Sequence, residues 1–421
     1  MELDDYVEAG LVHEIHTSER RSFRSCRRRW DWISRQRYYP IVTPHYFEFG
    51  TAFHVAQEVY YDPSKWSWDR EVMAQHAILA FVNTCEDQRA AALKAAPNLY
   101  DAAREQDYND RVELGKGMLK HYFYNIAPNI DRGWIPVKVE IGFKVIIPNP
   151  ETGEEAIWCA CNECFEKWLK HEQIEGPPGT VITTAAQANE WNEDIYRFMF
   201  NGLPAVYAGR LDMLAQDPDG HLWIFDWKTA KNVSKDYEFL YLDDQVGSYP
   251  WALKKLDLDV KGFIYHEQRK GYPQPPKRNV NRRLGCMYSV ARNQDTDYET
   301  YLKTVQEEDT EAYKAGCYDE FLKFLQGEGI VYFDRHQIPK SDAELLEIER
   351  NIGFETLDML DPGLRIYPSA GRFSCGFCAY RQPCMEQNAQ GDYKYALDTL
   401  FQKLDHYYLR NRPSTESKGG E

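Results

Sequence analysis

The chain has 421 residues, and its 66 acidic residues outnumber 50 basic ones to give a net charge of −16 at pH 7. Its length and ordinary hydrophobic content indicate a folded globular protein with a substantial core, and they exclude a disordered chain. No apolar run approaches the roughly 20 residues needed to cross a bilayer, and the first residues are acidic, unlike a signal peptide. We therefore expect a cytoplasmic protein with no membrane partner.

Helical patterns dominate the first third of the chain. Ser18 suits the N-cap of a helix over 18–37, in which large and basic side chains recur at helical spacing. A second helix is predicted from near Phe49. A mostly helical stretch then covers 66–126.

The pattern then changes from helical to alternating. Residues 137–147 alternate as a strand does. Two further strand patterns, 205–215 and 221–228, are joined by Asp217-Pro-Asp-Gly, a strong turn signal, so a β-hairpin is predicted. Beyond it the patterns predict a helix over 243–256, a strand over 262–266 and another strand over 330–335.

The order of these elements predicts an α/β fold. A central mixed sheet would be flanked by helices, with a helical N-terminal part. We interpret residues 1–410 as one domain with an irregular insertion over 149–199 and a helical region over 280–360. Residues 411–421 are polar and rich in Gly and Ser, and we expect them to form a disordered tail.

The hairpin carries charged side chains that are costly in a core. Asp226 and Lys228 are two apart on one strand and share a face, and pairing across the turn brings Asp212 beside them. Such a group is unfavourable unless it binds something. The two carboxylates suit Mg²⁺ or Mn²⁺, which polarises a phosphate and activates a bound water, while Lys228 steers that water or stabilises the pentavalent phosphate. The alternative is an exposed strand with a surface salt bridge.

In their order along the chain, these residues resemble the PD-(D/E)xK nuclease superfamily, and its RecB-like branch most of all. That branch carries Gly-Arg-x-Asp, then Asp-x-Lys-Thr, then a helical Gln-x-x-x-Tyr. The matching segments here are Gly209-Arg-Leu-Asp212, Asp226-Trp-Lys228-Thr and Gln245-Val-Gly-Ser-Tyr249. The resemblance implies a restriction-endonuclease-like core in which both aspartates bind metal and Lys228 activates water. It also implies that Gln245 and Tyr249 orient the lysine and the DNA.

Three further positions bear on this resemblance. The branch has an upstream helical Gly-x-x-x-His, which Gly50-Thr-Ala-Phe-His54 matches, so His54 is implied as a further metal ligand; a structural histidine is the alternative. Glu140 matches an acidic position often seen in the branch. Pro250 departs from the pattern, because a proline kinks a helix directly after Tyr249 and leaves the placement of that tyrosine open.

The cysteines suggest a second metal centre. Cys375, Cys378 and Cys384 stand at a spacing that calls for a fourth soft ligand, and Cys26 is the candidate. One cysteine before the nuclease motifs and three after them resembles the iron–sulfur RecB-like exonucleases, which include CRISPR-associated exonucleases, phage relatives and the AddB nuclease domain. This resemblance spans most of the chain, from residue 18 to 384, and implies a structural [4Fe–4S] cluster in a C-terminal cysteine region. Structural Zn²⁺ is the main alternative, because four thiolates also suit zinc.

The remaining cysteines are interpreted as ordinary thiols. A long chain without a secretory pattern is not expected to be held by disulfides. A second metal site in the insertion is the alternative for one group of them. That group is Cys159, Cys161 and Cys164, with His171 beyond it, and the predicted core thiols are Cys85, Cys286 and Cys317.

Basic residues gather in two stretches, 20–37 and 269–283, each with aromatics or prolines among them. This mixture is typical of a groove wall that contacts phosphates, although solvated surface is the alternative. The candidate DNA contacts are Arg27, Arg28, Arg269 and Lys270.

The sequence as a whole predicts a metal-dependent DNA nuclease that hydrolyses phosphodiester bonds. The resemblance favours an exonuclease on single-stranded or end-bearing DNA. The chain has no Gly-x₄-Gly-Lys-Ser/Thr loop, so any ATP-driven helicase or recombination protein would be a separate partner. The alternatives are a structure-specific endonuclease on the same core and a DNA-binding or scaffold protein that does not cut.

Overall fold

The structure is a computed structural model. It describes residue 7 and residues 11–41, 45–95, 101–153, 158–159, 203–234, 236–279, 285–361 and 363–404. Most of the predicted 149–199 insertion lies outside the described residues, as do Cys161, Cys164, His171 and the predicted tail over 411–421.

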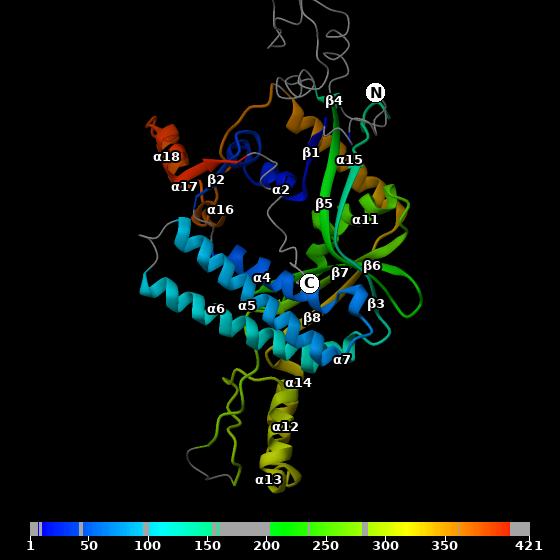
Figure 1. Cartoon of the computed structure of the whole chain (residues 1–421), viewed down its shortest axis with the longest axis vertical. Coiled ribbons are helices and arrows are strands. Elements are labelled where there is room, and N and C mark those ends of the chain that lie inside the picture. The colour runs from blue at the N-terminus through cyan, green and yellow to red at the C-terminus, as the bar shows by residue number, and fades with distance from the viewer. Residues whose placement is uncertain are drawn as a thin grey trace, which may run out of the picture.

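A seven-stranded mixed sheet forms the centre of the molecule (Figure 1). Its longest strand is β5 (Leu203–Gln216), and β3 (Ile135–Ile146) runs antiparallel along one edge of it. The other edge of β5 is shared, because β1 (His13–Ile15) pairs with its start and β6 (Leu222–Ala230) with its end. The sheet is completed by β7 (Val260–Arg269) parallel to β6, β8 (Phe333–Pro339) antiparallel to β7, and β4 (Trp158–Cys159) against β5.

The strands β5 and β6 part within the hairpin. Their ladder ends at the Met213–Phe225 pair, and β1 takes up the same edge of β5 only at Tyr207. We call this parting of the two strands the fork. It lies in the middle of the sheet, where the backbone of both strands is accessible to side chains from neighbouring elements.

One face of the sheet is covered by a layer of helices. Here α4 (His45–Tyr60) packs on α5 (Arg70–Ala95), and α5 packs on α6 (Ala102–His121), as the blue and cyan ribbons of Figure 1 show. The aromatic residues Phe225 and Trp227 alternate on β6 and point into this layer, where they join its hydrophobic core. Short helical turns complete the layer: η2 (Pro63–Lys65), η4 (Tyr122–Ile126) and α7 (Ala127–Ile130).

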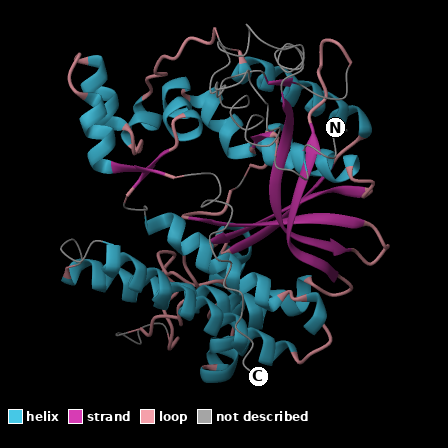
Figure 2. Cartoon of the chain, turned by 45° about the horizontal axis from the view of Figure 1, so that its top comes forward, coloured by secondary structure: helices cyan, strands magenta, loops and turns pink. Residues whose placement is uncertain are grey.

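The opposite face is covered by α2 (Thr17–Ser25), α11 (Asp244–Lys255) and α15 (Asp342–Leu360). A 3₁₀ turn, η5 (Glu238–Leu242), leads into α11, whose first N–H groups are capped by the Asp243 carboxylate. Figure 2 shows helices on both sides of the sheet. The predicted α/β architecture, with its helical N-terminal part, is confirmed.

The predicted helix over 18–37 is wrong in its detail. It begins at Thr17 rather than after Ser18, and it breaks at Cys26, whose backbone is extended. Two short pieces follow, α3 (Arg27–Trp30) and the π-helical η1 (Asp31–Arg35). The break has a tertiary cause: Arg28 N–H donates to Tyr367 O, and Ser369 N–H donates to the Cys26 sulfur, so contacts to a distant segment replace helical hydrogen bonds.

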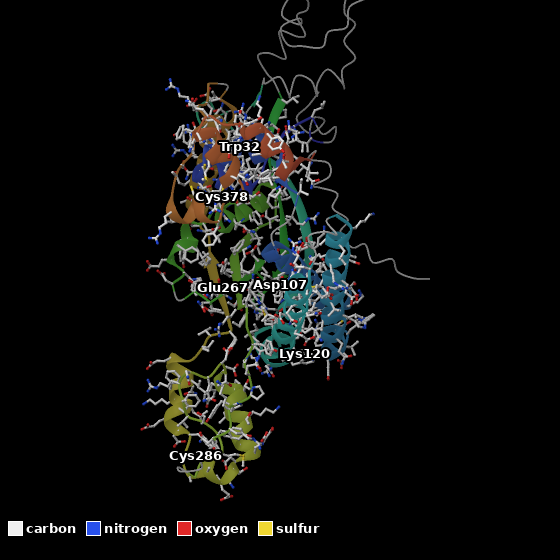
Figure 3. All side chains as sticks on the ribbon, turned by 90° about the vertical axis from the view of Figure 1, so that its left-hand side faces the viewer. Trp32, Asp107, Lys120, Glu267, Cys286 and Cys378 are labelled. Carbon is white, nitrogen blue, oxygen red and sulfur yellow. A yellow bond between two sulfur atoms is a disulfide. The ribbon has the colours of Figure 1, made fainter. Side chains whose placement is uncertain are left out.

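The N-terminal and C-terminal parts of the chain meet at one corner. There β2 (Tyr38–Pro40) pairs antiparallel with β9 (Phe401–Lys403). Trp32, Tyr380 and Phe401 belong to a small hydrophobic cluster beneath this pair, and Figure 3 shows Trp32 and Cys378 in the same region. The helices of this corner are α16 (Arg372–Gly376), α17 (Arg381–Asn388) and α18 (Tyr393–Leu400).

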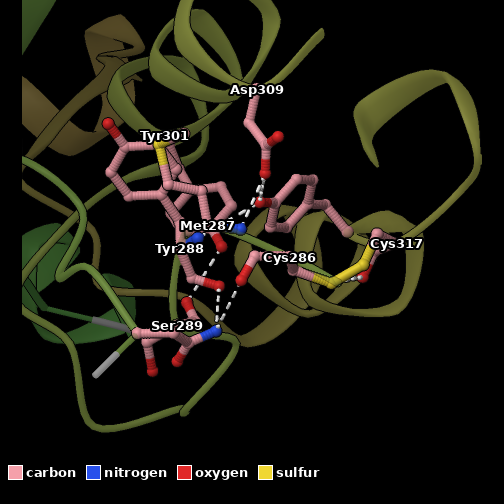
Figure 4. Close-up of a disulfide and its surroundings, with 9 residues drawn as sticks. Cys286, Met287, Tyr288, Ser289, Tyr301, Asp309 and Cys317 are labelled. Carbon is pink, nitrogen blue, oxygen red and sulfur yellow. Dashed lines mark hydrogen bonds between the residues drawn. A yellow bond between two sulfur atoms is a disulfide. The ribbon is translucent and has the colours of Figure 1, made fainter. Parts of the chain in front are cut away.

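A separate lobe projects from the body between β7 and β8 (Figures 1 and 3). It contains α12 (Tyr298–Glu308), α13 (Thr310–Lys314) and α14 (Asp319–Glu328), which pack around a hydrophobic cluster of their own. Cys286 and Cys317 both belong to this cluster and form a disulfide, with Cα atoms 6.3 Å apart (Figure 4).

The prediction that Cys286 is a core residue is confirmed, and Cys317 packs against the same cluster, but the expectation that these two cysteines are unpaired thiols is wrong. Their sequence separation of 31 residues gives no sign of the lobe that brings them together. Disulfides are uncommon in reducing compartments, so the expected cytoplasmic location did not anticipate this bond. Cys85 is confirmed as a buried free thiol, and burial raises its pKa to about 11. Within the described ranges, no helix is long and apolar enough to span a membrane.

Gly262 tests the packing of the sheet. A Cβ at this position would overlap the backbone oxygen of Ile338 and lie 2.7 Å from the Cα of Pro339, so β7 and β8 would have to separate. We expect Gly262→Ala to lower the free energy of unfolding by about 1–3 kcal/mol, measured by urea denaturation. Gly142→Ala is the matched control in β3, because its Cβ would meet nothing within 4 Å. Equal stability of the two variants would contradict this account of the β7–β8 contact.

Candidate active site

Asp212 lies at the fork between β5 and β6. Because the β5–β6 ladder ends at the Met213–Phe225 pair, the N–H of Trp227 does not bond to the β5 backbone, and it donates to Asp212 Oδ2 at 2.7 Å. The carboxylate is buried, with 9% of the residue exposed. Burial alone would raise the pKa of Asp212, but His54, Lys228 and the Trp227 N–H together hold it below its ordinary value. Asp212 is therefore a carboxylate at neutral pH.

Asp226 and Lys228 form a closed network with Gln245. The Lys228 ammonium donates to Asp226 Oδ1 at 2.8 Å and to Gln245 Oε1 at 3.3 Å, while Gln245 Nε2 donates to Asp226 Oδ1 at 2.8 Å. Burial would lower the pKa of Lys228, but Asp226 and Asp212 raise it above its ordinary value. Burial raises the pKa of Asp226 despite the lysine. Gln245 therefore contacts both charged residues, and its role in orienting the lysine for catalysis stays a prediction.

His54 reaches Asp212 from the helical layer. It belongs to α4, and its Nδ1 lies 3.3 Å from Asp212 Oδ1. Its ring meets the Trp227 ring edge-on, with centroids 6.1 Å apart. Burial would lower the pKa of His54, but Asp212 raises it above its ordinary value.

Glu140 completes this group from β3. The pairs Val139–Met213 and Ile141–Leu211 place it opposite Asp212. Its backbone φ of +49° lies in the left-handed region, which costs a residue with a side chain about 1–3 kcal/mol. His54, Glu140 and Asp212 can each offer one ligand atom, and these atoms all lie within 4.8 Å of one another. One nitrogen and two carboxylate oxygens at this spacing fit a divalent cation such as Mg²⁺ or Mn²⁺.

The electrostatics of Glu140 agree with a cation site. Burial raises the pKa of Glu140 to about 7, and the negative charges of Asp212 and Glu58 add to the effect. Interactions with Arg210 and His54 offset only part of this increase in the pKa of Glu140. A divalent cation beside these carboxylates would favour their ionised forms. Asp226 is not part of the group within 4.8 Å, because Lys228 and Gln245 hold its carboxylate.

Tyr249 does not join the carboxylates. It lies in α11, which continues through Pro250, and it is buried with its ring 5.1 Å from that of Phe143. A hydrogen bond links it to Thr17, and burial raises its hydroxyl pKa well above the ordinary value. Tyr249 therefore packs in the core beneath the site rather than lining it.

The four predicted DNA contacts all have partners within the protein. Arg27 lies between the rings of Phe23 and Tyr367, and Arg28 donates to Asn388 at 2.7 Å. In the second basic stretch, Arg269 pairs with Asp295 at 3.1 Å, and the Lys270 ammonium lies 5.2 Å from the centre of the Phe49 ring. Arg282 and Arg283, also in this stretch, lie outside the described residues.

The four predicted cluster cysteines gather at the corner where the chain ends meet. Cys375 accepts the Gly371 N–H at 3.4 Å, and Cys384 accepts the Arg28 guanidinium at the same distance. Burial raises the pKa of Cys378, and the nearby Cys26 and Cys375 raise it further. Among the described residues, no three of these thiols lie within 4.8 Å of one another.

Sequence reasoning left two acidic residues out of the site. Glu140 is predicted as an acidic match for which a direct metal role is one alternative, and the long insertion between β3 and β5 leaves its position opposite Asp212 unpredicted. Glu58 lies four residues after His54 on α4, and that helical spacing is a signal by which it could have been found. The negative charge of Glu58 raises the pKa of Glu140, and burial raises the pKa of Glu58.

The fold and this site agree with the comparison to known families. The PD-(D/E)XK nuclease superfamily matches residues 17–385, which is most of the chain. The chain therefore belongs to the PD-(D/E)XK nuclease superfamily. No curated protein matches it.

The raised pKa of Glu140 predicts a pH-dependent stability. A carboxyl whose pKa rises from 4.5 to about 7 on folding stabilises the protein below pH 4.5, and this contribution is lost as the pH rises through about 7. In EDTA, we expect wild-type protein to lose up to about 3 kcal/mol more than Glu140→Gln between pH 4.5 and 8, measured by urea unfolding. Glu347→Gln, on α15, is the control and should follow the wild type. Parallel pH profiles for wild type and Glu140→Gln would contradict the assignment.

Proposed function

We propose that this protein is a metal-dependent DNA nuclease that hydrolyses phosphodiester bonds. The observation that carries the proposal is the fork, where the possible ligands His54, Glu140 and Asp212 adjoin the Asp226–Lys228 pair. Membership of the PD-(D/E)XK nuclease superfamily supports the same chemistry. The superfamily typically uses divalent metals, and Mg²⁺ or Mn²⁺ suits this set of hard ligands.

In this proposal, His54, Glu140 and Asp212 hold the metal, with Asp226 as the further ligand that the sequence predicts. A bound Mg²⁺ or Mn²⁺ polarises the phosphate and lowers the pKa of water. Lys228 keeps its proton at neutral pH because its pKa is raised. It therefore serves as a hydrogen-bond donor that orients water and stabilises negative charge on the phosphate, rather than as a base. Gln245 fixes the lysine through its amide oxygen.

The preferred substrate in this proposal is single-stranded or end-bearing DNA, cut as an exonuclease cuts. Its support is the resemblance to RecB-like exonucleases, in the order of Gly50–His54, Gly209–Asp212, Asp226–Lys228 and Gln245. A structure-specific endonuclease on the same core is the second candidate. A protein that binds DNA without cutting is disfavoured by the complete set of acidic residues and lysine.

The proposal also includes a [4Fe–4S] cluster held by Cys26, Cys375, Cys378 and Cys384. Three of these sulfurs accept hydrogen bonds from Ser369, Gly371 and Arg28, and such bonds are common around cluster thiolates. The resemblance to iron–sulfur RecB-like exonucleases favours a cluster, and a tetrahedral zinc site on the same four thiolates is the alternative. Its role would be to fasten the chain ends together.

Substitution of Asp226 tests the proposed cleavage of DNA. With Mn²⁺ and end-labelled linear DNA, we expect Asp226→Ala to reduce the cleavage rate by about 10²–10³-fold, because the site loses a buried charge that positions Lys228. Asp219→Ala, in the exposed turn of the same hairpin, is the matched control and should cut at the wild-type rate. Wild-type protein that cuts no DNA, or an Asp226→Ala variant as active as wild type, would contradict the proposal.

The exonuclease and endonuclease forms of the proposal are separated by the ends of the substrate. Covalently closed circular DNA offers no end, so an exonuclease should leave it intact while degrading linear single strands and linear duplexes. Cleavage of closed circles at a comparable rate would favour the endonuclease.

The cluster predicts a coloured protein. We expect anaerobically purified protein to be brown, with broad absorbance near about 400 nm, and Cys384→Ser to lose most of this absorbance and its iron. Cys85→Ser, which changes a buried free thiol far from the corner in sequence, should keep the colour per mole of folded protein. A colourless wild-type protein with stoichiometric zinc would identify the alternative metal.

A further inference from the structure

Arg210 is an exposed cation beside the proposed metal ligands. It lies on β5 two residues before Asp212 and therefore shares its face. Its guanidinium lies 3.4 Å from Glu140 Oε2, and 57% of its side chain is exposed. The mostly buried carboxylates behind it point toward the metal position, whereas the arginine faces solvent at the edge of the same site.

The contact between Arg210 and Glu140 competes with metal binding. Glu140 is also one of the three residues whose ligand atoms lie within 4.8 Å of one another. An exposed ion pair is worth only about 0–1 kcal/mol, so a divalent cation bound by several ligands would draw the carboxylate away. The guanidinium would then lose its ion pair with Glu140, with the Glu58 carboxylate still near it, and its planar set of donors matches the oxygens of a phosphate.

Open space lies beside this guanidinium. Gly142 stands directly opposite Arg210 in the β3–β5 ladder, and a Cβ there would meet no atom of the described residues within 4 Å. Gly209 differs, because a Cβ there would overlap the Phe143 ring, so packing requires that glycine. Packing does not require Gly142.

A second open position lies on the helix that carries His54. Gly50 precedes His54 by four residues and so lies on the same face of α4, and within the described part of the chain its Cβ would also meet nothing within 4 Å. Glycine inside a helix costs about 1 kcal/mol relative to alanine, and packing gives no reason for that cost here. Glycines that no neighbour demands often mark the close approach of a ligand.

We propose that Arg210 binds a phosphate of the substrate strand once a metal ion has drawn Glu140 away, and that Gly142 and Gly50 leave room for that strand on either side of the metal. The proposal rests on the proposed nuclease function and identifies where the sugar–phosphate backbone lies. A contact of this kind is made to the sugar–phosphate backbone of the DNA and not to its bases, so it contributes affinity without sequence preference. Arg210 is thus a substrate-binding residue. We call the path of the strand past Gly142 and Gly50 the glycine track.

The experiment measures binding rather than cleavage, so its failure is distinct from a failure to cut. A fluorescent single-stranded oligonucleotide is titrated against protein carrying Asp226→Asn, which prevents turnover, with Mn²⁺ or with EDTA. With Mn²⁺, we expect Arg210→Gln to weaken binding about tenfold and to reduce the slope of log K against log salt by about 0.7. In EDTA the effect should be smaller, because Arg210 stays on Glu140.

The matched control is Arg350→Gln on α15. Arg350 has the same ion-pair distance, 3.4 Å to Glu347, and 56% side-chain exposure, and it should change neither the affinity nor the slope. Mn²⁺ affinity without DNA should be unchanged or tighter in Arg210→Gln and weaker in Glu140→Gln. Wild-type DNA affinity in Arg210→Gln, or a loss of Mn²⁺ affinity there, would overturn the proposal and leave the arginine as a support for Glu140.

The glycine track has its own test. Gly142→Val and Gly50→Leu add side chains into open space, so both variants should keep or raise the melting temperature. Each should nevertheless weaken oligonucleotide binding about tenfold or more by occupying the track. Gly327→Leu, an equally open helical glycine in the lobe, is the control and should bind as wild type does. Folded Gly142→Val and Gly50→Leu proteins with undiminished affinity would refute the track.

Discussion

The hydrogen bond from the Trp227 N–H to Asp212 fixes the geometry of this site. A buried N–H without an acceptor costs about 1–3 kcal/mol, and a buried carboxylate without donors costs more. Where β5 and β6 part, the Trp227 N–H gives the Asp212 carboxylate a donor, and the carboxylate gives that N–H an acceptor. Asp212 is thereby held within the sheet rather than at its margin. His54 and Glu140 reach it from α4 and β3 because the fork leaves its other oxygen open to both elements.

The charges around the fork are balanced unevenly, as the proposed metal site requires. The negative charge of Asp226 is compensated by Lys228, and that of Asp212 is compensated by His54 and a backbone N–H. Glu140 is compensated only in part, by the exposed Arg210 and by His54, and its pKa stays raised while its backbone lies in the left-handed region. Buried charge is tolerated where a ligand completes it, and strain of this kind collects at functional sites. Glu140 is the residue that a cation would relieve most.

Local patterns predicted those parts of the molecule whose geometry is local. The hairpin and its charged face follow from alternation and a turn signal, the helix bearing Gln245 follows from the helical pattern over 243–256, and all three are present. Features that depend on long-range register were missed. Cys26 interrupts its helix because it contacts Ser369, Glu140 faces Asp212 across an insertion, and Cys286 meets Cys317 only in a folded lobe. No periodicity in one segment encodes which distant segment will lie against it.

The cysteine corner and the active site are joined through one helix interface. Arg20, in the predicted basic stretch, is buried and pairs with Asp244 at 3.6 Å and with Glu355 at 2.6 Å, so it fastens α2 to α11 and α15 rather than contacting phosphate. The helix α2 ends at Cys26, and α11 carries Gln245 in its first turn. Truncating one partner of a buried ion pair leaves the others uncompensated. Holding Cys26 to the C-terminal helices therefore also holds the start of α11, and with it the amide that positions Lys228.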